Sequence, residues 1–222
     1  MGAAQRKGIL VLGIVFGLAF QSISNADTGV TRRGCTIRGT RGSDNLHGTG
    51  RHDVICGFGG RDVIRARAGA DLVFGGKGPD VLQGDQGRDE LHGGPGRDRL
   101  LGGLRNDSIF AGDGRDDVHA GEGNDVIHAG AANDFASGDS GNDRSEGGLG
   151  HDVLIENFGI DVIDGGQGGD RCLSTLDAFF APDPIGDRIV GGLGIDEFVK
   201  DPNDVATGVE RSPEFPCDLG PS

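Results

Sequence analysis

Apolar and acidic residues recur along most of this chain with a fixed period of nine residues. From residue 44 to residue 170 an aspartate stands at every ninth position without a gap. The residue two places later is apolar in nearly every unit, Ala136 and Ser145 being the weakest. A fixed repeat of this kind indicates stacked structural units rather than an ordinary globular core. The aspartates of the series are Asp44, Asp53, Asp62, Asp71, Asp80, Asp89, Asp98, Asp107, Asp116, Asp125, Asp134, Asp143, Asp152, Asp161 and Asp170.

Each unit has a glycine-rich part and an apolar part. The consensus is Gly-Gly-x-Gly-x-Asp-x-apolar-x, whose residues we number as positions 1 to 9, with the aspartate at position 6. Glycine favours tight turns with positive φ, so positions 1 to 6 predict a turn and positions 7 to 9 a three-residue strand. Strands that short are not stable alone. Two units then form a coil with one strand on each side, and stacking at about 4.8 Å predicts roughly seven coils in a rod about 35 Å long.

The unit is most complete at residues 75–83, 93–101 and 147–155. It resembles the RTX, or hemolysin-type, calcium-binding nonapeptide repeat. The resemblance covers residues 39–174, and a further copy stands at 191–199 after an interruption. It implies an all-β chain folded as a right-handed parallel β-roll, a β-solenoid of nine-residue repeats, with calcium bound between the turns.

The composition indicates a thin hydrophobic core, and the charge indicates that the chain binds cations. Glycine makes up 45 of the 222 residues, apolar residues only 35%, and the formal net charge is −14. A chain this acidic repels nucleic acid and anionic membrane surfaces and attracts cations. Acidity for solubility alone is the alternative, but the acids of this chain stand in register. We therefore expect calcium ions, and no nucleic acid, as partners.

The aspartates predict two ladders, because alternate units fall on the same side of the coil. Neighbours on one ladder lie about 5 Å apart. Two carboxylates at so short a distance repel each other, and a divalent cation between them turns this repulsion into attraction. Calcium takes six to eight oxygen ligands, and carboxylate and carbonyl oxygens favour it over zinc or copper. All fifteen aspartates are therefore candidate metal ligands, and ladders of eight and seven leave gaps for at most thirteen Ca²⁺ ions.

Departures from the motif lower that ceiling. Arg51, Arg105 and Ala132 replace the glycine at position 4, and Glu156 and Asn157 replace positions 1 and 2 of their unit. The cleanest sites are expected along Asp80, Asp98 and Asp116, and around Asp152 and Asp170.

Residues 1–26 have the features of a secretory signal peptide. Arg6 and Lys7 precede an apolar run at 8–20, and the small residues at 24–26 provide a cleavage site after Ala26. Such a run is too short to span a bilayer, which needs about twenty residues. We therefore expect a secreted, extracellular protein with no membrane span after cleavage. A retained membrane anchor is the alternative.

Four cysteines agree with an oxidising compartment. The economical pairing is Cys35–Cys56 and Cys172–Cys217, one disulfide near each end of the repeats; other connectivities and free thiols stay open. If Cys35 keeps the coil register, its neighbour is Asp53, and Cys56 lies about 10 Å further along. That exceeds disulfide reach. The first pair therefore requires residues 27–38, the expected N-terminal cap, to leave the register.

The period breaks after Leu173. We expect residues 39–174 to form the calcium-binding roll, and residues 175–222 a degenerate repeat and a small C-terminal cap that covers the last coil. A ligand pocket around Phe179 and Phe180 is the alternative reading of this segment.

The chain has no visible parts of an enzyme. No metalloprotease helix motif, nucleotide-binding loop or EF-hand spacing is present. The Gly-Asp-Ser-Gly run at residues 138–141 resembles a serine-protease nucleophile motif, but it is explained by the repeat. His92 and His128 lie two coils apart, about 10 Å, too far to share a zinc ion. We expect a stand-alone calcium-binding structural or matrix module and no enzyme.

The alternative is an adhesive protein that uses the roll to display a surface to an extracellular polysaccharide or protein. A regular outward stripe of threonine or aromatic residues would favour it, and the outward positions after each aspartate are mixed. An enzyme fragment whose catalytic partner is encoded elsewhere is the third hypothesis.

Overall fold

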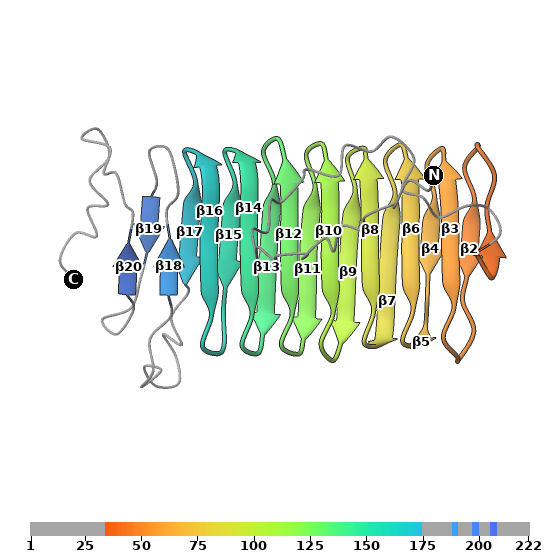
Figure 1. Ribbon diagram of the computed structural model, residues 1–222, viewed down its shortest axis with the longest axis horizontal. Coiled ribbons are helices and arrows are strands. Elements are labelled where there is room, and N and C mark those ends of the chain that lie inside the picture. The colour runs from red at the N-terminus through yellow and green to blue at the C-terminus, as the bar shows by residue number, and fades with distance from the viewer. Residues whose placement is uncertain (1–33, 175–187, 191–196, 200–204, 208–222) are drawn as a thin grey trace, which may run out of the picture.

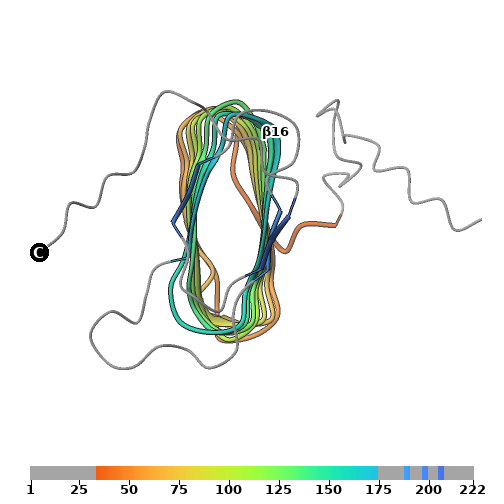
Figure 2. The same ribbon diagram turned by 90° about the vertical axis from the view of Figure 1, so that its left-hand side faces the viewer.

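The computed structural model describes residues 34–174, 188–190, 197–199 and 205–207. These residues form two parallel ten-stranded sheets and no helix, a β-solenoid of about seven turns, which confirms the predicted fold class. Figure 1 shows the strands stacked side by side along the roll, and Figure 2, down its axis, shows a flattened oval with one sheet on each long side.

The strands of the two sheets alternate along the chain. Sheet A consists of β1 (Ile37–Arg38), β3 (Val54–Gly59), β6 (Leu72–Lys77), β8 (Glu90–Pro95), β10 (Ser108–Asp113), β12 (Val126–Ala131), β14 (Arg144–Gly150), β16 (Val162–Gly168), β18 (Arg188–Val190) and β20 (Val205–Thr207). Sheet B consists of β2 (Asn45–His47), β4 (Val63–Arg65), β5 (Ala68–Gly69), β7 (Val81–Gly87), β9 (Arg99–Leu104), β11 (Asp117–Glu122), β13 (Phe135–Ser140), β15 (Val153–Glu156), β17 (Arg171–Ser174) and β19 (Glu197–Val199).

The pairing register confirms that two units make one coil. Ile109 pairs with Ile127, and every described pair between β1 and β17 has the same separation of eighteen residues. After β17 the separation changes, because Cys172 pairs with Phe198. The insertion after Leu173 therefore adds eight residues to one coil, and the copy of the repeat that contains Phe198 continues the roll.

Most strands have six or seven residues, so the expected three-residue strand is wrong. Backbone pairing continues through positions 1 to 3 of the next unit, as between Gly112 and Gly130. Glycine is a poor strand former in isolation. Here each glycine pairs with a residue in the same conformation one coil away, and these backbone hydrogen bonds outweigh its intrinsic preference.

Two positions of each strand face the interior, and this explains why the core is thin. In β10 the buried residues are Ile109 at position 8 and Ala111 at position 1. Position 8 supplies the apolar side chains of both sheets, and position 1 is glycine or alanine in every unit except the one that contains Glu156. The buried cluster consists of Ile55, Ile64, Ala66, Val73, Leu82, Leu91, Leu100, Ile109, Ala111, Val118, Ala120, Ile127, Ala136, Leu154 and Ile163.

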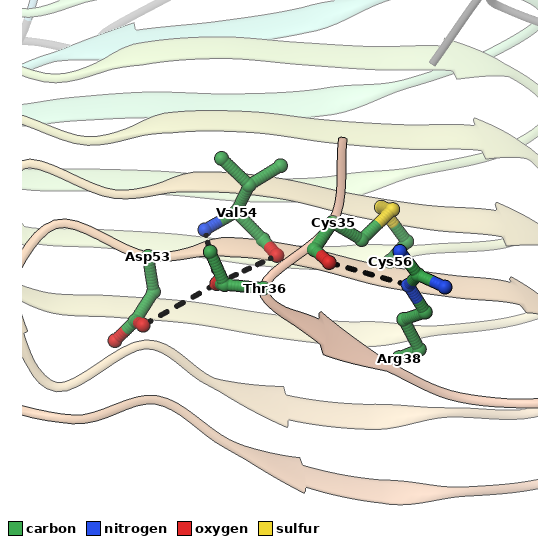
Figure 3. The surroundings of a disulfide bond; sticks show 6 residues. All are labelled: Cys35, Thr36, Arg38, Asp53, Val54 and Cys56. Atoms are coloured by element: carbon green, nitrogen blue, oxygen red, sulfur yellow. Dashed lines mark hydrogen bonds between the residues drawn. A yellow bond between two sulfur atoms is a disulfide. The ribbon is translucent and has the colours of Figure 1, made fainter. Parts of the chain in front are cut away.

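A disulfide joins Cys35 and Cys56 at the first coil, as predicted, with their Cα atoms 6.0 Å apart (Figure 3). The expected route to it is wrong, because Ile37 and Arg38 keep the ordinary register with Ile55 and Cys56. The chain bends at Thr36, next to Cys35, and the disulfide forms while Ile37 and Arg38 stay in register.

Hydrogen bonds hold this bend in place. The Thr36 hydroxyl donates to Val54 O at 3.1 Å, and the Arg38 Nε donates to Cys35 O at 3.2 Å. The pair Cys172–Cys217, the signal peptide and the C-terminal cap lie outside the residues whose side chains are described, so they stay predictions.

Candidate metal centre

The repeated aspartates line the two narrow edges of the oval, where the chain turns from one sheet to the other. The row from Asp44 to Asp170 precedes the strands of sheet B, and the row from Asp53 to Asp161 precedes those of sheet A. Every member except the half-buried Asp44 is buried, and most are 0–3% exposed. The structure thus brings the fifteen sequence-predicted residues into two ladders.

One carboxylate oxygen of every ladder aspartate except the first two, Asp44 and Asp53, binds the backbone of the preceding coil. In both ladders Oδ1 accepts a hydrogen bond from the backbone N–H of the aspartate one coil earlier, as between Asp98 N and Asp116 Oδ1 at 2.7 Å. Such a bond, of 2.7–2.9 Å, bridges each of the thirteen gaps. The spacing of the carboxylates is therefore fixed by the backbone.

The second carboxylate oxygen has no hydrogen-bond partner in most units. Oδ2 is buried and unpartnered in Asp62, Asp71, Asp80, Asp89, Asp98, Asp107, Asp116, Asp125, Asp134 and Asp152. A buried, ionised oxygen without a partner is costly, and native proteins almost always satisfy such groups with a hydrogen bond, a proton or a cation. The two ladders therefore present rows of oxygen atoms that need a proton or a cation.

In six of these units a backbone carbonyl lies beside Oδ2, and the glycine at position 1 makes room for both. A Cβ on Gly93 would lie 2.7 Å from Asp98 Oδ2 and 2.5 Å from the carbonyl oxygen of Ala111, in the next coil. Gly75 and Gly147 show the same crowding with Asp80 and Asp152. Carboxylate and carbonyl oxygens are the ligands that Ca²⁺ prefers, so these residues fit calcium.

Burial raises the pKa of the ladder carboxyls in the middle of the roll above the usual value. It is the largest cause throughout; the backbone N–H bond lowers the pKa in part, and neighbouring ladder carboxylates raise it again in most of these units. The pKa rises to about 8 in Asp98, Asp107 and Asp134, to about 7 in Asp143, and to about 6 in Asp80, Asp89, Asp116 and Asp125. Without a cation the middle of the ladders therefore resists ionisation.

Two of the residues that replace the glycine at position 4 adopt its left-handed conformation. Arg105 and Ala132, at position 4, have φ of 79° and 86°. The ladder bonds to the aspartates that follow them are intact, from Asp89 N to Asp107 Oδ1 and from Asp116 N to Asp134 Oδ1, both at 2.8 Å. These departures strain the backbone by about 1–2 kcal/mol each but leave the ladder geometry unchanged.

Glu156 joins the ladder site, which the sequence analysis did not foresee. Its side chain points inward from position 1, is 0% exposed, and accepts a hydrogen bond from the Ser145 hydroxyl. Carboxylate oxygens of Glu156, Asp143 and Asp161 lie within 4.8 Å of one another and could hold a metal ion. Burial raises the pKa of Glu156 well above its usual value. The sequence signal for Glu156 was its place at position 1, which faces the interior when the strand continues into the next unit.

A column of stacked rings on the outer face of sheet A was also missed. Phe74, His92, Phe110 and His128 stack along four successive coils, with ring centroids 4.8, 4.8 and 5.0 Å apart. The available sequence signal was their regular spacing of eighteen residues at position 9. The outward residues considered for a display stripe were those at position 7. His92 and His128 stand two coils apart, as predicted, with Phe110 between them.

Comparison with models of protein families gives four matches to the RTX calcium-binding nonapeptide repeat, at residues 38–73, 65–100, 92–127 and 119–154. Together they cover more than half of the chain. No curated protein matches it. Among the described residues no helix is long and apolar enough to cross a membrane.

Proposed function

Because the chain belongs to the RTX calcium-binding nonapeptide repeat family, we propose that it is a secreted protein that folds on binding Ca²⁺ and serves as a structural or matrix module rather than an enzyme. The observation that carries the calcium-dependent folding is the row of buried, unpartnered Oδ2 atoms in the two ladders. Calcium supplies positive charge between carboxylates that otherwise repel one another.

The chain itself supplies the oxygen ligands. In the stretch with the most regular units, Asp80, Asp98 and Asp116 present Oδ2, and the carbonyl oxygens at position 1 of the next coil lie beside two of them, Asp80 and Asp98. Because each gap joins two coils, an ion there couples their folding, and binding and folding become one equilibrium.

The test compares far-ultraviolet circular dichroism of the purified chain in excess chelator and in excess calcium. We expect little β structure in chelator at neutral pH and a full β signal with calcium. Magnesium at the same concentration is the control, because Mg²⁺ is smaller and gives up its water reluctantly. A complete β signal in chelator would contradict metal-dependent folding.

Secretion is supported by the charged and apolar pattern of residues 1–26 and by the disulfide between Cys35 and Cys56, which is typical of oxidising compartments. We expect the mature protein outside the cell to begin at Asp27. N-terminal sequencing of the exported protein checks this, and a mature chain that retains the apolar run would point to an anchor instead.

The alternative function is adhesion, with the calcium-stabilised roll as a display surface. The aromatic column of sheet A does not by itself favour it. Each ring lies face to face with the next at 7–14°, so their faces are covered by one another. A display function requires a different surface.

A further inference from the structure

The outer surface of the roll is basic although the chain as a whole is acidic. Between residues 34 and 174 the ladder aspartates and Glu156 account for sixteen of the twenty-four acids, and all of them except Asp44 are buried. The remaining eight acids share the surface with fourteen arginines and lysines. Once calcium neutralises the ladders, the surface that faces a partner is therefore net positive.

One edge of the roll carries a row of basic side chains. Along the edge at which the strands of sheet A end, the upper edge in Figure 1, five successive turns each carry one exposed basic residue at position 3 or 5. These residues, which we call the basic rail, are Arg41, Arg61, Lys77, Arg97 and Arg115.

The rail follows the axis of the roll because the turns stack, although its residues stand at either position 3 or position 5. Lys77 O and Cβ lie next to Gly59, at position 3 of the preceding coil, and Arg61 N donates to Ser43 Oγ at 3.1 Å. The charges therefore follow the axis of the roll in steps of about 4.8 Å, over roughly 19 Å.

No described residue neutralises the rail. On the adjacent face of sheet B, Arg65 and Arg99 form ion pairs of 3.8 Å with Asp85 and Asp117. By contrast, the five rail residues have no ion pair among the residues that the structure describes, and the only outer acid in their five turns is Asp113. Unpaired charges in a row at this spacing are available to a partner.

We propose that the basic rail binds an extended acidic polysaccharide that carries a carboxylate or sulfate on successive sugars. One sugar with its glycosidic bond advances a chain by about the rise of one coil, so anionic groups can meet the rail residue by residue. The proposal rests on the proposed calcium binding, because ladder carboxylates beneath the rail repel a polyanion until cations neutralise them.

Nucleic acids fit the rail less well. The phosphates of a duplex wind around its axis once in about 10 base pairs, so a rail along one edge of the roll meets only a few of them. Single strands bind by stacking their bases on exposed aromatic rings. The described ring column covers its own faces and lies on sheet A rather than on the rail edge.

The test measures binding of dextran sulfate to the purified chain in excess calcium at low ionic strength, with uncharged dextran as the neutral probe. The rail variant carries Arg61→Gln, Arg97→Gln and Arg115→Gln. The control variant carries Arg51→Gln, Arg88→Gln and Arg144→Gln, which make the same charge change at exposed arginines away from the rail. Circular dichroism of the same samples reports calcium-induced folding separately.

We expect the wild-type chain to bind dextran sulfate and the rail variant to bind about a hundredfold more weakly, since a basic residue at an anionic surface contributes roughly a fivefold factor. The control variant should stay within about threefold of wild type. Equal losses in the two variants, or tighter binding of duplex DNA than of dextran sulfate, would overturn the proposal. A chain that folds with calcium yet ignores dextran sulfate would overturn the rail and leave calcium binding standing.

Discussion

Replacing Asp98 by asparagine should change stability in opposite directions with and without calcium. Asp98 is 1% exposed, its Oδ1 accepts the N–H of Asp80 at 2.7 Å, and its Oδ2 has no partner. Asparagine keeps the shape and the oxygen that accepts this hydrogen bond but cannot ionise. In the metal-free chain it therefore removes a buried acid, and in the calcium-loaded chain it removes a charged ligand from two adjacent gaps.

The metal-free effect follows from the raised pKa. Burial lifts the pKa of Asp98 from 3.8 to about 8, helped by Asp116 and Asp80. Because the folded-state pKa lies above the unfolded one, the acid favours folding fully only below pH 4, and this contribution disappears as the pH rises towards 8. One pKa unit corresponds to about 1.4 kcal/mol, so at pH 7 Asp98→Asn should stabilise the calcium-free chain by at most about 4 kcal/mol.

With calcium bound, Asp98→Asn should instead destabilise the chain. Removing one charge from a buried, paired arrangement costs about 3–5 kcal/mol, and calorimetric titration should show weaker binding in the two gaps that Asp98 shares. Asp113→Asn is the matched control, because Asp113 is an exposed acid near the same edge whose loss makes the same charge change. It should shift stability by less than about 0.5 kcal/mol in either condition.

With calcium, urea unfolding followed by circular dichroism measures the change in stability; in chelator, circular dichroism without urea measures the pH at which β structure is lost. Since the calcium-free wild-type chain folds best at low pH, the comparison in chelator runs from pH 4 to pH 8. The reasoning is refuted if Asp98→Asn destabilises the chain in both conditions, or if Asp98→Asn and Asp113→Asn behave alike.

In excess chelator, β structure should increase as the pH falls from 8 to 5, because protonation relieves the buried ladder carboxyls; circular dichroism across this range checks it, and β structure that is independent of pH would contradict it. Ala132→Gly should stabilise the calcium-loaded roll by about 1 kcal/mol, because residue 132 has φ of 86°, whereas Ala131→Gly, one residue earlier and outside the left-handed region, should not; urea unfolding separates the two. Replacing Cys35 and Cys56 together by serine should lower stability by about 3 kcal/mol, as expected for a disulfide that spans 21 residues, and an unchanged unfolding midpoint would argue against that contribution.

The ladders and the stacking could be predicted from the sequence because both depend on the period alone. An aspartate at every ninth position fixes two rows once two units make a coil, and the observed pairs such as Ile109 with Ile127 confirm that register. The buried residues at position 8 follow from the same pattern, including the weak members Ala136 and Ser145.

Features that depend on three-dimensional neighbours could not be read from the period. The intrinsic preference of glycine predicts a turn at positions 1 and 2. These positions become part of a strand only because they pair with the neighbouring coils. The inward direction of Glu156 depends on that longer strand. Likewise the bend at Thr36, which lets Cys35 reach Cys56 without moving Ile37, is a local change that linear spacing does not reveal.

The most direct test of the central claim is a diffraction experiment on crystals of the calcium-loaded protein that locates the ions by their anomalous scattering. The account predicts ions in rows along both edges of the roll, each about 2.3–2.6 Å from an aspartate Oδ2 and from backbone carbonyl oxygens. The middle gaps, between Asp80, Asp98 and Asp116, should be filled. Ions bound only at outer acids such as Asp113 or Glu122, with the Oδ2 atoms of the ladders left without a metal, would contradict it.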